Sequence, residues 1–336
     1  MPRLRRIDCS EPGIRRVRRG RGFSYVGADG APIRDREVLD RIRALAIPPA
    51  WEDVWVCPDE QGHIQATGLD AAGRKQYRYH DAWRERRDRA KFDRMLDFAR
   101  TLPRLRTRLD DDLARRGLVR ERVLACAVCL LDLGFFRVGS ERYAEENETY
   151  GLATLRRGHL RFEHGEAVFD YRSKGGRRHV QAVADPSVLP TLRALKRRRG
   201  RGSALFAYHA GRRWIDVRSE EVNEYLRAAA GDDFTAKDFR TWNATVLAAV
   251  VLGRENGAPA SKAARRRRIR QAVGEVAEYL DNTPAVARAS YIDPRVFDRF
   301  DSGETIHRAL RRAAAANGGG FADRERIERA VMALIR

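Results

Sequence analysis

The chain has 336 residues, a formal net charge of +20 and a hydrophobic fraction of 43%. This hydrophobic fraction excludes a disordered polycation, and the length predicts about two domains. The charge favours a polyanionic partner, nucleic acid above all, and no apolar stretch reaches the 18 residues expected of a membrane span.

The chain opens with a basic segment. Residues 1–22 have no apolar core, which predicts a mobile basic arm rather than a signal peptide. Short alternating stretches with glycine-rich turns follow, together with one amphipathic helix that ends at Pro48 and Pro49. We therefore expect residues 1–80 to form a small β-rich domain.

The pattern changes at residue 82, where long helical periodicities begin. Among them, two alternating runs flank Gly175 and Gly176 and predict a β-hairpin. The predicted fold class is α+β, with a β-rich domain over residues 1–80 and a larger, mainly helical domain with a small hairpin or sheet over residues 82–336.

The cysteines predict neither disulfides nor a metal site. Cys126 and Cys129 have C-x-x-C spacing, but no second pair completes a zinc site and both lie in an apolar run. We expect buried helical thiols, no cofactor and a cytoplasmic location.

Arg137 follows an apolar helix and precedes a Gly-Ser break. Burying a guanidinium is costly unless an anion meets it. Two interpretations follow: a structural salt bridge to Glu141, Glu145 or Glu146, or a site for an anionic ligand.

Lys174 lies at the tip of the predicted hairpin, in YRSKGGRR. Only six of the 67 basic residues are lysines, and a lysine can release a proton whereas an arginine effectively cannot. Lys174 is either a solvated turn residue or an amine that enters a nucleic-acid groove and transfers a proton.

The stretch FTAKDFRTWNAT places Lys237 and Arg240 three residues apart at the start of a helix, so they share one face. The amino-terminus of a helix also favours phosphate. Phe239 and Trp242 are expected to anchor this helix by burial.

A short helix is predicted before Tyr291. Thr283 is a suitable N-cap, Pro284 suits the first helical position, and Asp293-Pro294 ends the helix. Tyr291 at the helix end is either a packed aromatic residue or a nucleophile.

Taken together, these positions give the order Arg, Lys on a hairpin, Lys-x-x-Arg on a helix, then Tyr. In this order of residue types, the chain resembles the small type IB DNA topoisomerases of the poxviral and bacterial kind. The resemblance covers most of the chain and includes PPAW, GRKQYRYH, RVGSERY, SKGG, TAKDFRTW and SYIDP.

The resemblance implies a catalytic role for each position. Tyr291 would attack a DNA phosphodiester and form a 3′-phosphotyrosyl bond. Arg137 and Arg240 would stabilise the charge of the transition state, and Lys174 would protonate the leaving 5′-oxygen as general acid.

Asn282 stands where the family usually has histidine, nine residues before Tyr291. An amide can donate a hydrogen bond to a phosphate oxygen but cannot transfer a proton, so we expect a slower reaction rather than none. Continuous helix would place the two residues on opposite faces, so Asn282 must act from before the Thr283 cap.

The resemblance further implies a monomer whose two lobes clamp duplex DNA in the nucleoid and relax positive and negative supercoils without ATP or metal. No membrane and no small-molecule substrate is expected. The expected DNA contacts in GRKQYRYH are Arg74, Lys75, Gln76, Tyr77 and Tyr79, each of which is alternatively a strand residue that packs on its own domain. Lys237 is also an expected DNA contact.

Two other functions stay open at this point. Tyrosine recombinases share the carboxy-terminal fold and the same catalytic types, but they usually have His-x-x-Arg where this chain has Lys237-Asp-Phe-Arg240. A non-enzymatic, arginine-rich DNA-binding protein would explain the charge but not the SYIDP stretch.

Overall fold

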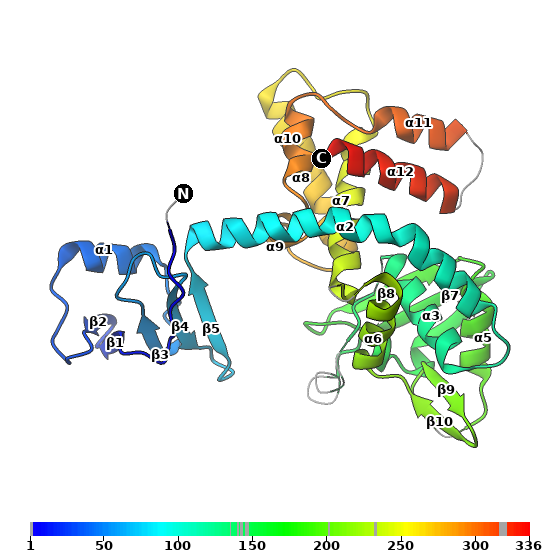
Figure 1. The fold of residues 1–336 in the computed structure, drawn as a ribbon, viewed down its shortest axis with the longest axis horizontal. Coiled ribbons are helices and arrows are strands. Elements are labelled where there is room, and N and C mark those ends of the chain that lie inside the picture. The colour runs from blue at the N-terminus through cyan, green and yellow to red at the C-terminus, as the bar shows by residue number, and fades with distance from the viewer. Residues whose placement is uncertain are drawn as a thin grey trace. The chain divides into compact units, whose positions relative to one another are not determined.

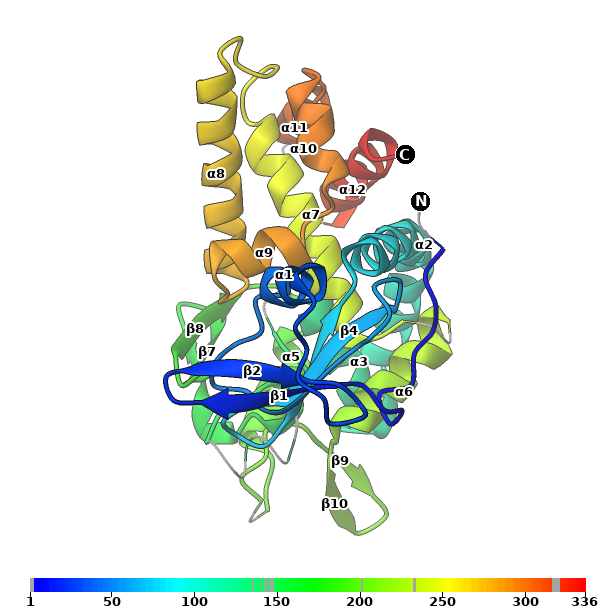
Figure 2. The ribbon, with the colours of Figure 1, turned by 90° about the vertical axis from the view of Figure 1, so that its left-hand side faces the viewer.

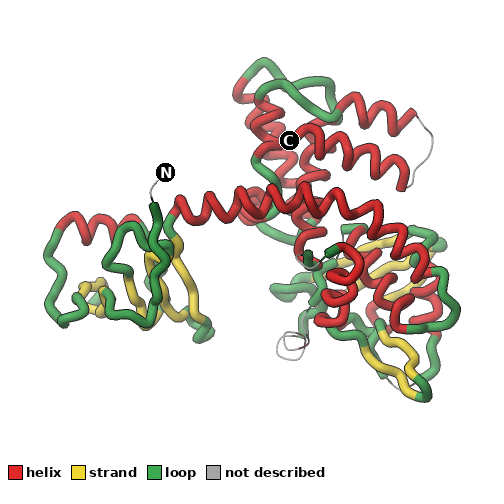
Figure 3. Tube along the Cα trace, in the orientation of Figure 1, coloured by secondary structure: helices red, strands yellow, loops and turns green. Residues whose placement is uncertain are grey.

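One long helix, α2 (Asp81–Leu113), joins a strand-rich beginning of the chain to a helix-rich remainder (Figure 1, Figure 3). The computed structural model describes residues 3–134, 136–139, 141, 144, 148–200, 202–231, 234–315 and 321–336. Contacts divide the chain into two compact units, Met1–Phe92 (unit 1) and Asp93–Arg336 (unit 2). The domain boundary expected at residues 80–82 coincides with the start of α2, whereas the two units divide inside this helix.

Unit 1 is built on one antiparallel sheet with the strand order β2-β1-β3-β4-β5. Its elements are β1 (Ile14–Arg19), β2 (Gly22–Val26), α1 (Arg36–Ala44), β3 (Glu52–Val56), β4 (Ile64–Leu69) and β5 (Lys75–Tyr79). A small core, which includes Ile14, Ile42 and Val56, forms between the sheet and α1.

Strand β1 corrects the prediction of a mobile arm over residues 1–22. It pairs with β2 from Arg15 to Arg19 (Figure 2) and with β3 at its start. The arginines of this strand hide the alternation of apolar and polar residues that indicates a strand. They can take the place of apolar residues, because a long side chain covers apolar surface with its methylene groups and keeps its charge at the edge. The Arg16 guanidinium illustrates this, since it lies 4.1 Å from the ring centre of Phe23 and donates to the carbonyl of Pro48.

Unit 2 is mainly helical, as predicted, with one three-stranded and one two-stranded antiparallel sheet. After α2, its helices are α3 (Arg120–Asp132), α5 (Leu189–Arg197), α6 (Ser219–Ala230), α7 (Ala236–Gly253), α8 (Lys262–Tyr279), α9 (Pro284–Ser290), α10 (Arg295–Asp301), α11 (His307–Ala315) and α12 (Phe321–Leu334). The remaining elements are the 3-10 turns Leu152–Thr154 and Arg157–His159 and the strands β6 (Leu160–Glu163), β7 (Glu166–Arg172), β8 (Arg178–Val183), β9 (Ala207–Ala210) and β10 (Arg213–Asp216).

Helix α7 is the central element of unit 2. It contacts α3, α6, α8, α10, α11 and α12, and it lies alongside α8 in both ribbon views (Figure 1, Figure 2). Phe239 and Trp242 are fully buried, as predicted, and the Phe239 ring packs edge-on against Phe98 of α2 at 5.0 Å. The helix that begins with Lys237 and Arg240 is therefore held rigidly from several sides.

Cys126 and Cys129 lie buried in α3 as free thiols, as predicted. Burial raises the pKa of both thiols, that of Cys129 to about 12. Across the described part of the chain, no helix is long and apolar enough to span a membrane.

Candidate active site

The five residues predicted to be catalytic line one pocket in unit 2, with a volume of about 250 Å³. The described lining residues are Arg137, Val138, Lys174, Ala236, Lys237, Arg240, Asn282 and Tyr291. Four of these side chains carry a positive charge and none a negative charge, so the pocket is electrostatically suited to an anion.

Arg137 is positioned by the segment that follows α3. Gly134 has φ +89°, and a side chain there would collide with the Tyr279 hydroxyl and the Asn243 amide. Further on, the main-chain carbonyl of Arg137 accepts a 2.7 Å hydrogen bond from the N–H of Leu152. The backbone of Arg137 is thus fixed on both sides.

The guanidinium of Arg137 faces the turn after α8. Its Nη2 donates to the carbonyl oxygens of Leu280 (3.2 Å) and Asp281 (2.9 Å) and lies 3.4 Å from Oδ1 of Asn282. These acceptors are neutral, so none of them cancels the charge of Arg137.

The three glutamates considered as salt-bridge partners of Arg137 have different outcomes. Glu141 accepts hydrogen bonds from the main-chain N–H and the hydroxyl of Ser219, and Glu145 and Glu146 lie outside the described residues.

Arg240 projects from the second turn of α7 and is only 7% exposed. Its Nη2 donates a 2.7 Å hydrogen bond to the Leu280 carbonyl, which Arg137 also contacts. Burial, and then the charge of Arg137, lower the pKa of Arg240 from its usual value. Two guanidiniums that share one carbonyl form a site that an anion would stabilise.

Of the described residues, three tyrosines and one acid, Asp281, line the inner side of this arginine pair. A narrow cavity behind the arginines is bordered by Tyr150, Tyr171 and Tyr279. Burial raises the pKa of Tyr171, and it raises that of Tyr279 to about 12. These phenols stay neutral near pH 7 and leave the positive charge of the arginines in place.

Tyr291 is the C-cap of the short helix α9, as predicted. Thr283 caps the start of this helix by accepting from the N–H of Val286 at 3.3 Å. The Tyr291 side chain is partly exposed, and its ring centre lies 5.4 Å from the Arg240 guanidinium. Tyr291 is therefore not a fully packed core aromatic residue.

Lys174 lies on the turn between β7 and β8 and is exposed, although it reaches the pocket. The turn is closed by Ser173, whose N–H donates to the carbonyl of Arg177 at 2.7 Å. The Ser173 hydroxyl donates to the carboxylate of Asp281, which also pairs with Arg177 at 3.4 Å. The hairpin turn is thereby attached to the segment beside Asn282.

Asn282 precedes the Thr283 cap, as the spacing requires, and lies on the pocket wall beside Arg137. Its amide nitrogen donates to the Leu280 carbonyl at 3.3 Å. Lys237, exposed in the first turn of α7, lies on the same pocket wall as Arg240.

In unit 1, three of the expected DNA contacts share one face of the edge strand β5. Successive side chains of a strand point to opposite sides, so Lys75, Tyr77 and Tyr79 alternate with Gln76. The rings of Tyr77 and Tyr79 stack at 5.8 Å, and Tyr77 is 41% exposed. This face combines a positive charge with aromatic surface.

Arg74 and Gln76 instead bond to Asp70. The Arg74 Nε and the Gln76 amide each lie 2.9 Å from Oδ2 of this carboxylate. The hydrogen bond from Arg74 lowers the pKa of Asp70 to about 2, so the carboxylate is charged at neutral pH.

Two residues that were not predicted from the sequence link the segments that form the site. Asp281 links the hairpin turn to the Arg137 segment, and Thr245 of α7 bonds to the backbone beside Tyr291. Asp281 adjoins Asn282, and Thr245 closes the TAKDFRTWNAT stretch, but only the fold brings their partners near.

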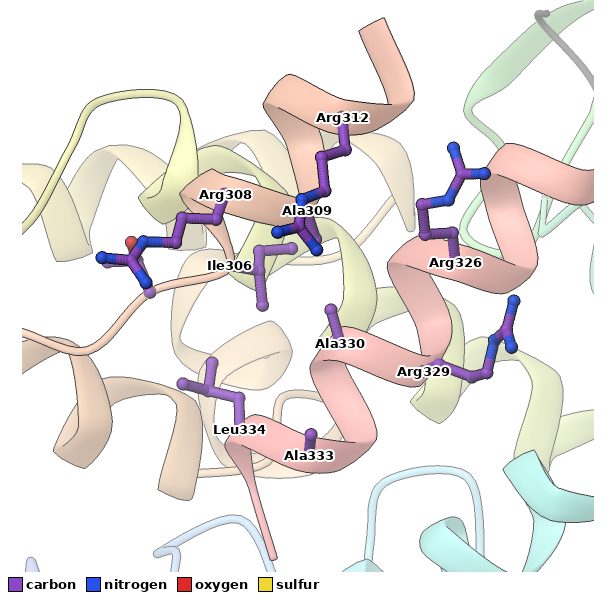
Figure 4. Close-up of a pocket in the computed structure, with 10 residues that line it drawn as sticks. Ile306, Arg308, Ala309, Arg312, Arg326, Arg329, Ala330, Ala333 and Leu334 are labelled. Carbon is purple, nitrogen blue, oxygen red and sulfur yellow. The ribbon is translucent and has the colours of Figure 1, made fainter. Parts of the chain in front are cut away.

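A larger pocket of about 660 Å³ lies between α11 and α12 (Figure 4). Its floor is apolar, and Arg308, Arg312, Arg326 and Arg329 surround it. None of the predicted site residues is among the residues that line it.

Comparisons with known proteins point to one family. Residues 80–313 match the family model of the eukaryotic DNA topoisomerase I catalytic core, and residues 22–70 match that of the bacterial DNA topoisomerase IB N-terminal domain. The chain is 30% identical over 287 residues to DNA topoisomerase 1B of Acanthamoeba polyphaga mimivirus, covering 83% of this chain and 85% of the relative.

Two further relatives agree with this result. DNA topoisomerase 1 of rabbit fibroma virus is 24% identical over 299 residues, covering 83% of this chain and 89% of the relative. DNA topoisomerase 1 of Schizosaccharomyces pombe is 30% identical over 138 residues, covering 40% of this chain and 16% of the relative. The chain belongs to the type IB DNA topoisomerases.

Proposed function

We propose that this chain relaxes positive and negative supercoils by cutting and resealing one strand of duplex DNA. In this mechanism the phenolic oxygen of Tyr291 attacks a backbone phosphorus and loses its proton to water. The P–O bond to the 5′-oxygen breaks, and the 3′ end is left joined to Tyr291. The reverse attack by the 5′-hydroxyl reseals the strand.

The observation behind this proposal is that Tyr291, Arg137, Lys174, Arg240 and Asn282 line a single pocket. Negative charge accumulates on the nonbridging phosphate oxygens in the transition state, and preorganised guanidiniums stabilise such charge without further rearrangement. Arg137 and Arg240 already converge on one carbonyl oxygen, at 3.2 and 2.7 Å, which holds the two guanidiniums close enough together to bind one phosphate with their remaining N–H groups.

Lys174 is proposed to protonate the leaving 5′-oxygen. An alkoxide is a poor leaving group, and general acid catalysis typically accelerates such a step by about 10²–10⁴-fold. Arginine at this position would keep the charge but could not release the proton. Asn282 is proposed to donate a hydrogen bond to a nonbridging oxygen.

The proposed DNA contacts differ in kind. Lys75, Tyr77 and Tyr79 would meet the DNA from one face of β5, and Lys237 would contact a phosphate beside the pocket. Arg74 and Gln76 would have to exchange Asp70 for DNA, so we expect them to contribute less.

The mechanism needs no ATP, because the energy of the phosphodiester bond is retained in the phosphotyrosyl ester. It assigns nucleophilic attack, charge stabilisation and protonation of the leaving group to side chains, and the phenolic proton to water, so no metal ion is required. All five residues come from one chain, which is consistent with action as a monomer on duplex DNA.

Tyr291→Phe removes only the nucleophilic oxygen, so relaxation and covalent attachment should both be lost while DNA binding remains. The test is relaxation of positively and negatively supercoiled plasmids in EDTA without ATP, followed by a detergent quench. Wild type should relax both plasmids and leave protein on a 3′ end.

Tyr225→Phe is the matched control and should relax DNA normally, because Tyr225 is buried in the same unit, donates its hydroxyl to Asp112 and lines neither the site pocket nor the cavity behind it. Normal relaxation by Tyr291→Phe would exclude Tyr291 as the nucleophile. Strand exchange between two sites without relaxation would instead favour a tyrosine recombinase.

A further inference from the structure

Asp281 contacts both sides of the proposed active site. Its main-chain carbonyl accepts a 2.9 Å hydrogen bond from Arg137, and its carboxylate accepts from the Ser173 hydroxyl at 2.5 Å. The same carboxylate lies 3.4 Å from the Arg177 guanidinium. Ser173 and Arg177 are the residues that close the turn holding Lys174.

The backbone at Asp281 is in the left-handed region, with φ +51°. Residues with side chains are uncommon there, because the conformation brings the side chain close to the backbone. In this conformation the carbonyl points toward Arg137 while the carboxylate points toward the hairpin. The contacts on both sides hold the residue in this conformation.

Ser173 is only 5% exposed, whereas Lys174 and the rest of the turn through Arg177 are exposed. The partly buried hydrogen bond from Ser173 to Asp281 is therefore a fixed point at the base of an exposed turn. A general acid must lie within hydrogen-bonding reach of the leaving oxygen, and a displacement of about 1 Å can reduce a rate about a hundredfold.

We propose that Asp281 is a positioning residue that holds the hairpin turn so that Lys174 meets the leaving 5′-oxygen. This inference rests on the proposed function, because it assumes that Lys174 acts as the acid. Asp281 itself touches neither the phosphate nor the leaving group. Its carboxylate acts through Ser173 and Arg177, and its carbonyl supports Arg137.

The two roles of Asp281 can be separated chemically. In cleavage, the Tyr291 O–P bond forms, the P–O5′ bond breaks, and the leaving oxygen takes a proton from Lys174. A substrate with sulfur in place of this 5′-oxygen departs as a stable thiolate and needs no proton. A defect in positioning the acid should therefore disappear on the sulfur substrate, whereas a defect in phosphate stabilisation should remain.

Asp281→Gly is the most direct variant, because glycine adopts positive φ freely and keeps the carbonyl that Arg137 uses. We expect single-turnover cleavage of the oxygen substrate to fall about 10- to 100-fold. Cleavage of the sulfur substrate should stay within about threefold of wild type, because this step does not use the acid.

Three variants serve as controls. Asp281→Asn keeps a hydrogen-bond acceptor for Ser173 and tolerates the left-handed backbone, so it should recover most of the lost rate. Lys174→Ala should cleave the oxygen substrate slowly and the sulfur substrate at nearly the wild-type rate. Arg137→Ala should cleave both substrates slowly.

Ser173→Ala tests the same link from the hairpin side. It should reproduce the substrate dependence of Asp281→Gly, and the double variant should be no slower than the slower single variant, because both remove one interaction. This variant also keeps the inference testable if Asp281→Gly fails to fold.

Equal losses on both substrates, or no loss on either, would overturn the positioning role. If wild type cleaves neither substrate, the proposed function fails, and this inference fails with it. If wild type and the Lys174 and Arg137 controls behave as expected but Asp281→Gly and Ser173→Ala match wild type, only the role of Asp281 is refuted.

Discussion

At the scale of single residues, the site is a group of positive charges held by neutral oxygens. The carbonyls of Leu280 and Asp281 accept hydrogen bonds from Arg137, and Leu280 also accepts from Arg240. Carbonyl dipoles orient guanidiniums without neutralising them, so a phosphate would gain nearly the full electrostatic interaction. Asn282 lies on the edge of this arrangement, on the wall of the same pocket.

The residue at 282 should affect the rate without being essential. Asn282→Ala removes one hydrogen bond to a charged group, an interaction of about 1.5–3 kcal/mol, so cleavage should slow about 10- to 100-fold. Asn282→His restores a donor and should cleave at least as fast as wild type. Single-turnover cleavage of a DNA duplex, measured between pH 5.5 and 8.5, compares the three proteins.

The pH dependence distinguishes a hydrogen-bond role from proton transfer. Histidine ordinarily titrates near pH 6.5, so Asn282→His should introduce a rise in rate below that pH that wild type lacks. Wild-type rates in Asn282→Ala would show that the amide does not touch the reacting phosphate.

At the scale of elements, helix α7 connects two parts of the site. Arg240 lies near its start, and Thr245 follows about one and a half turns later. The Thr245 hydroxyl accepts from the N–H of Asp293 at 3.1 Å and lies 3.4 Å from the carbonyl of Tyr291. One rigid helix therefore fixes both an arginine and the backbone that presents the tyrosine.

Thr245→Val should remove the hydrogen bond between α7 and the backbone beside Tyr291 while keeping the shape of the side chain. The buried Asp293 N–H would lose its partner, at a cost of about 1–3 kcal/mol, and Tyr291 would be held less precisely. We expect cleavage to slow about tenfold, because small displacements of a reacting group are costly. Urea unfolding and single-turnover cleavage measure the two effects.

Thr241→Val is the matched control for this prediction. Thr241 is equally buried in α7, but its hydroxyl bonds to the carbonyl of Lys237 within the same helix. Its cleavage rate should stay near that of wild type, and Thr245→Ser should recover the rate. If both valine variants slow cleavage equally, the contact with the Tyr291 turn is not responsible.

The elements differed in how far their sequence determined them. The Thr283 cap and Pro284 predict helix α9, and two alternating runs predict the hairpin, because these signals are local. Strand β1 was missed because arginines occupy most of its positions, and its burial depends on β2 and β3. Pairing with distant strands cannot be deduced from a six-residue stretch alone.

The candidate site shows the same limit. The residue types at Arg137, Lys174, Arg240 and Tyr291 and their order can be read from the sequence. Their convergence cannot, because it depends on contacts such as Arg137 with Asp281 and Ser173 with Asp281, which join residues more than a hundred positions apart. Asp281 could not be recognised from its neighbours. Its importance comes from a positive φ and from partners on a different element.

At the scale of the whole molecule, a buried ionic network joins distant parts of unit 2. Arg106 of α2 bonds to Asp132 of α3 at 2.9 Å and to Glu328 of α12 at 2.7 Å. Arg324 of α12 also pairs with Asp132 at 2.8 Å. Burial would raise the pKa of Asp132, but Arg324 and Arg106 outweigh it, so the pKa is lowered and the carboxylate is charged.

This network lies directly before the segment that positions Arg137. Asp132 ends α3, and its main-chain carbonyl accepts from Arg324 and from the amide of Asn243 on α7. The last helix of the chain is therefore connected to the base of the proposed active site. A buried ion pair need not add net stability, but removing one partner leaves an uncompensated charge.

Glu328→Gln should consequently destabilise unit 2 strongly. Glu328 is 4% exposed, and its loss leaves Arg106 and Arg324 to share the single carboxylate of Asp132. The expected cost is about 3–5 kcal/mol in the free energy of unfolding, measured by urea denaturation with circular dichroism. Glu325→Gln, on the same helix but outside the network, is the matched control and should change stability by less than about 0.5 kcal/mol.

A fully apolar replacement of the network is a second test. It combines Arg106→Met, Arg324→Met and Glu328→Leu, and it should restore much of the stability only if Asp132 is also replaced by a neutral residue. Without that change, the buried carboxylate of Asp132 would have lost both arginines. If Glu328→Gln lowers the free energy of unfolding no more than Glu325→Gln does, apolar packing rather than this network holds α12 against the rest of unit 2.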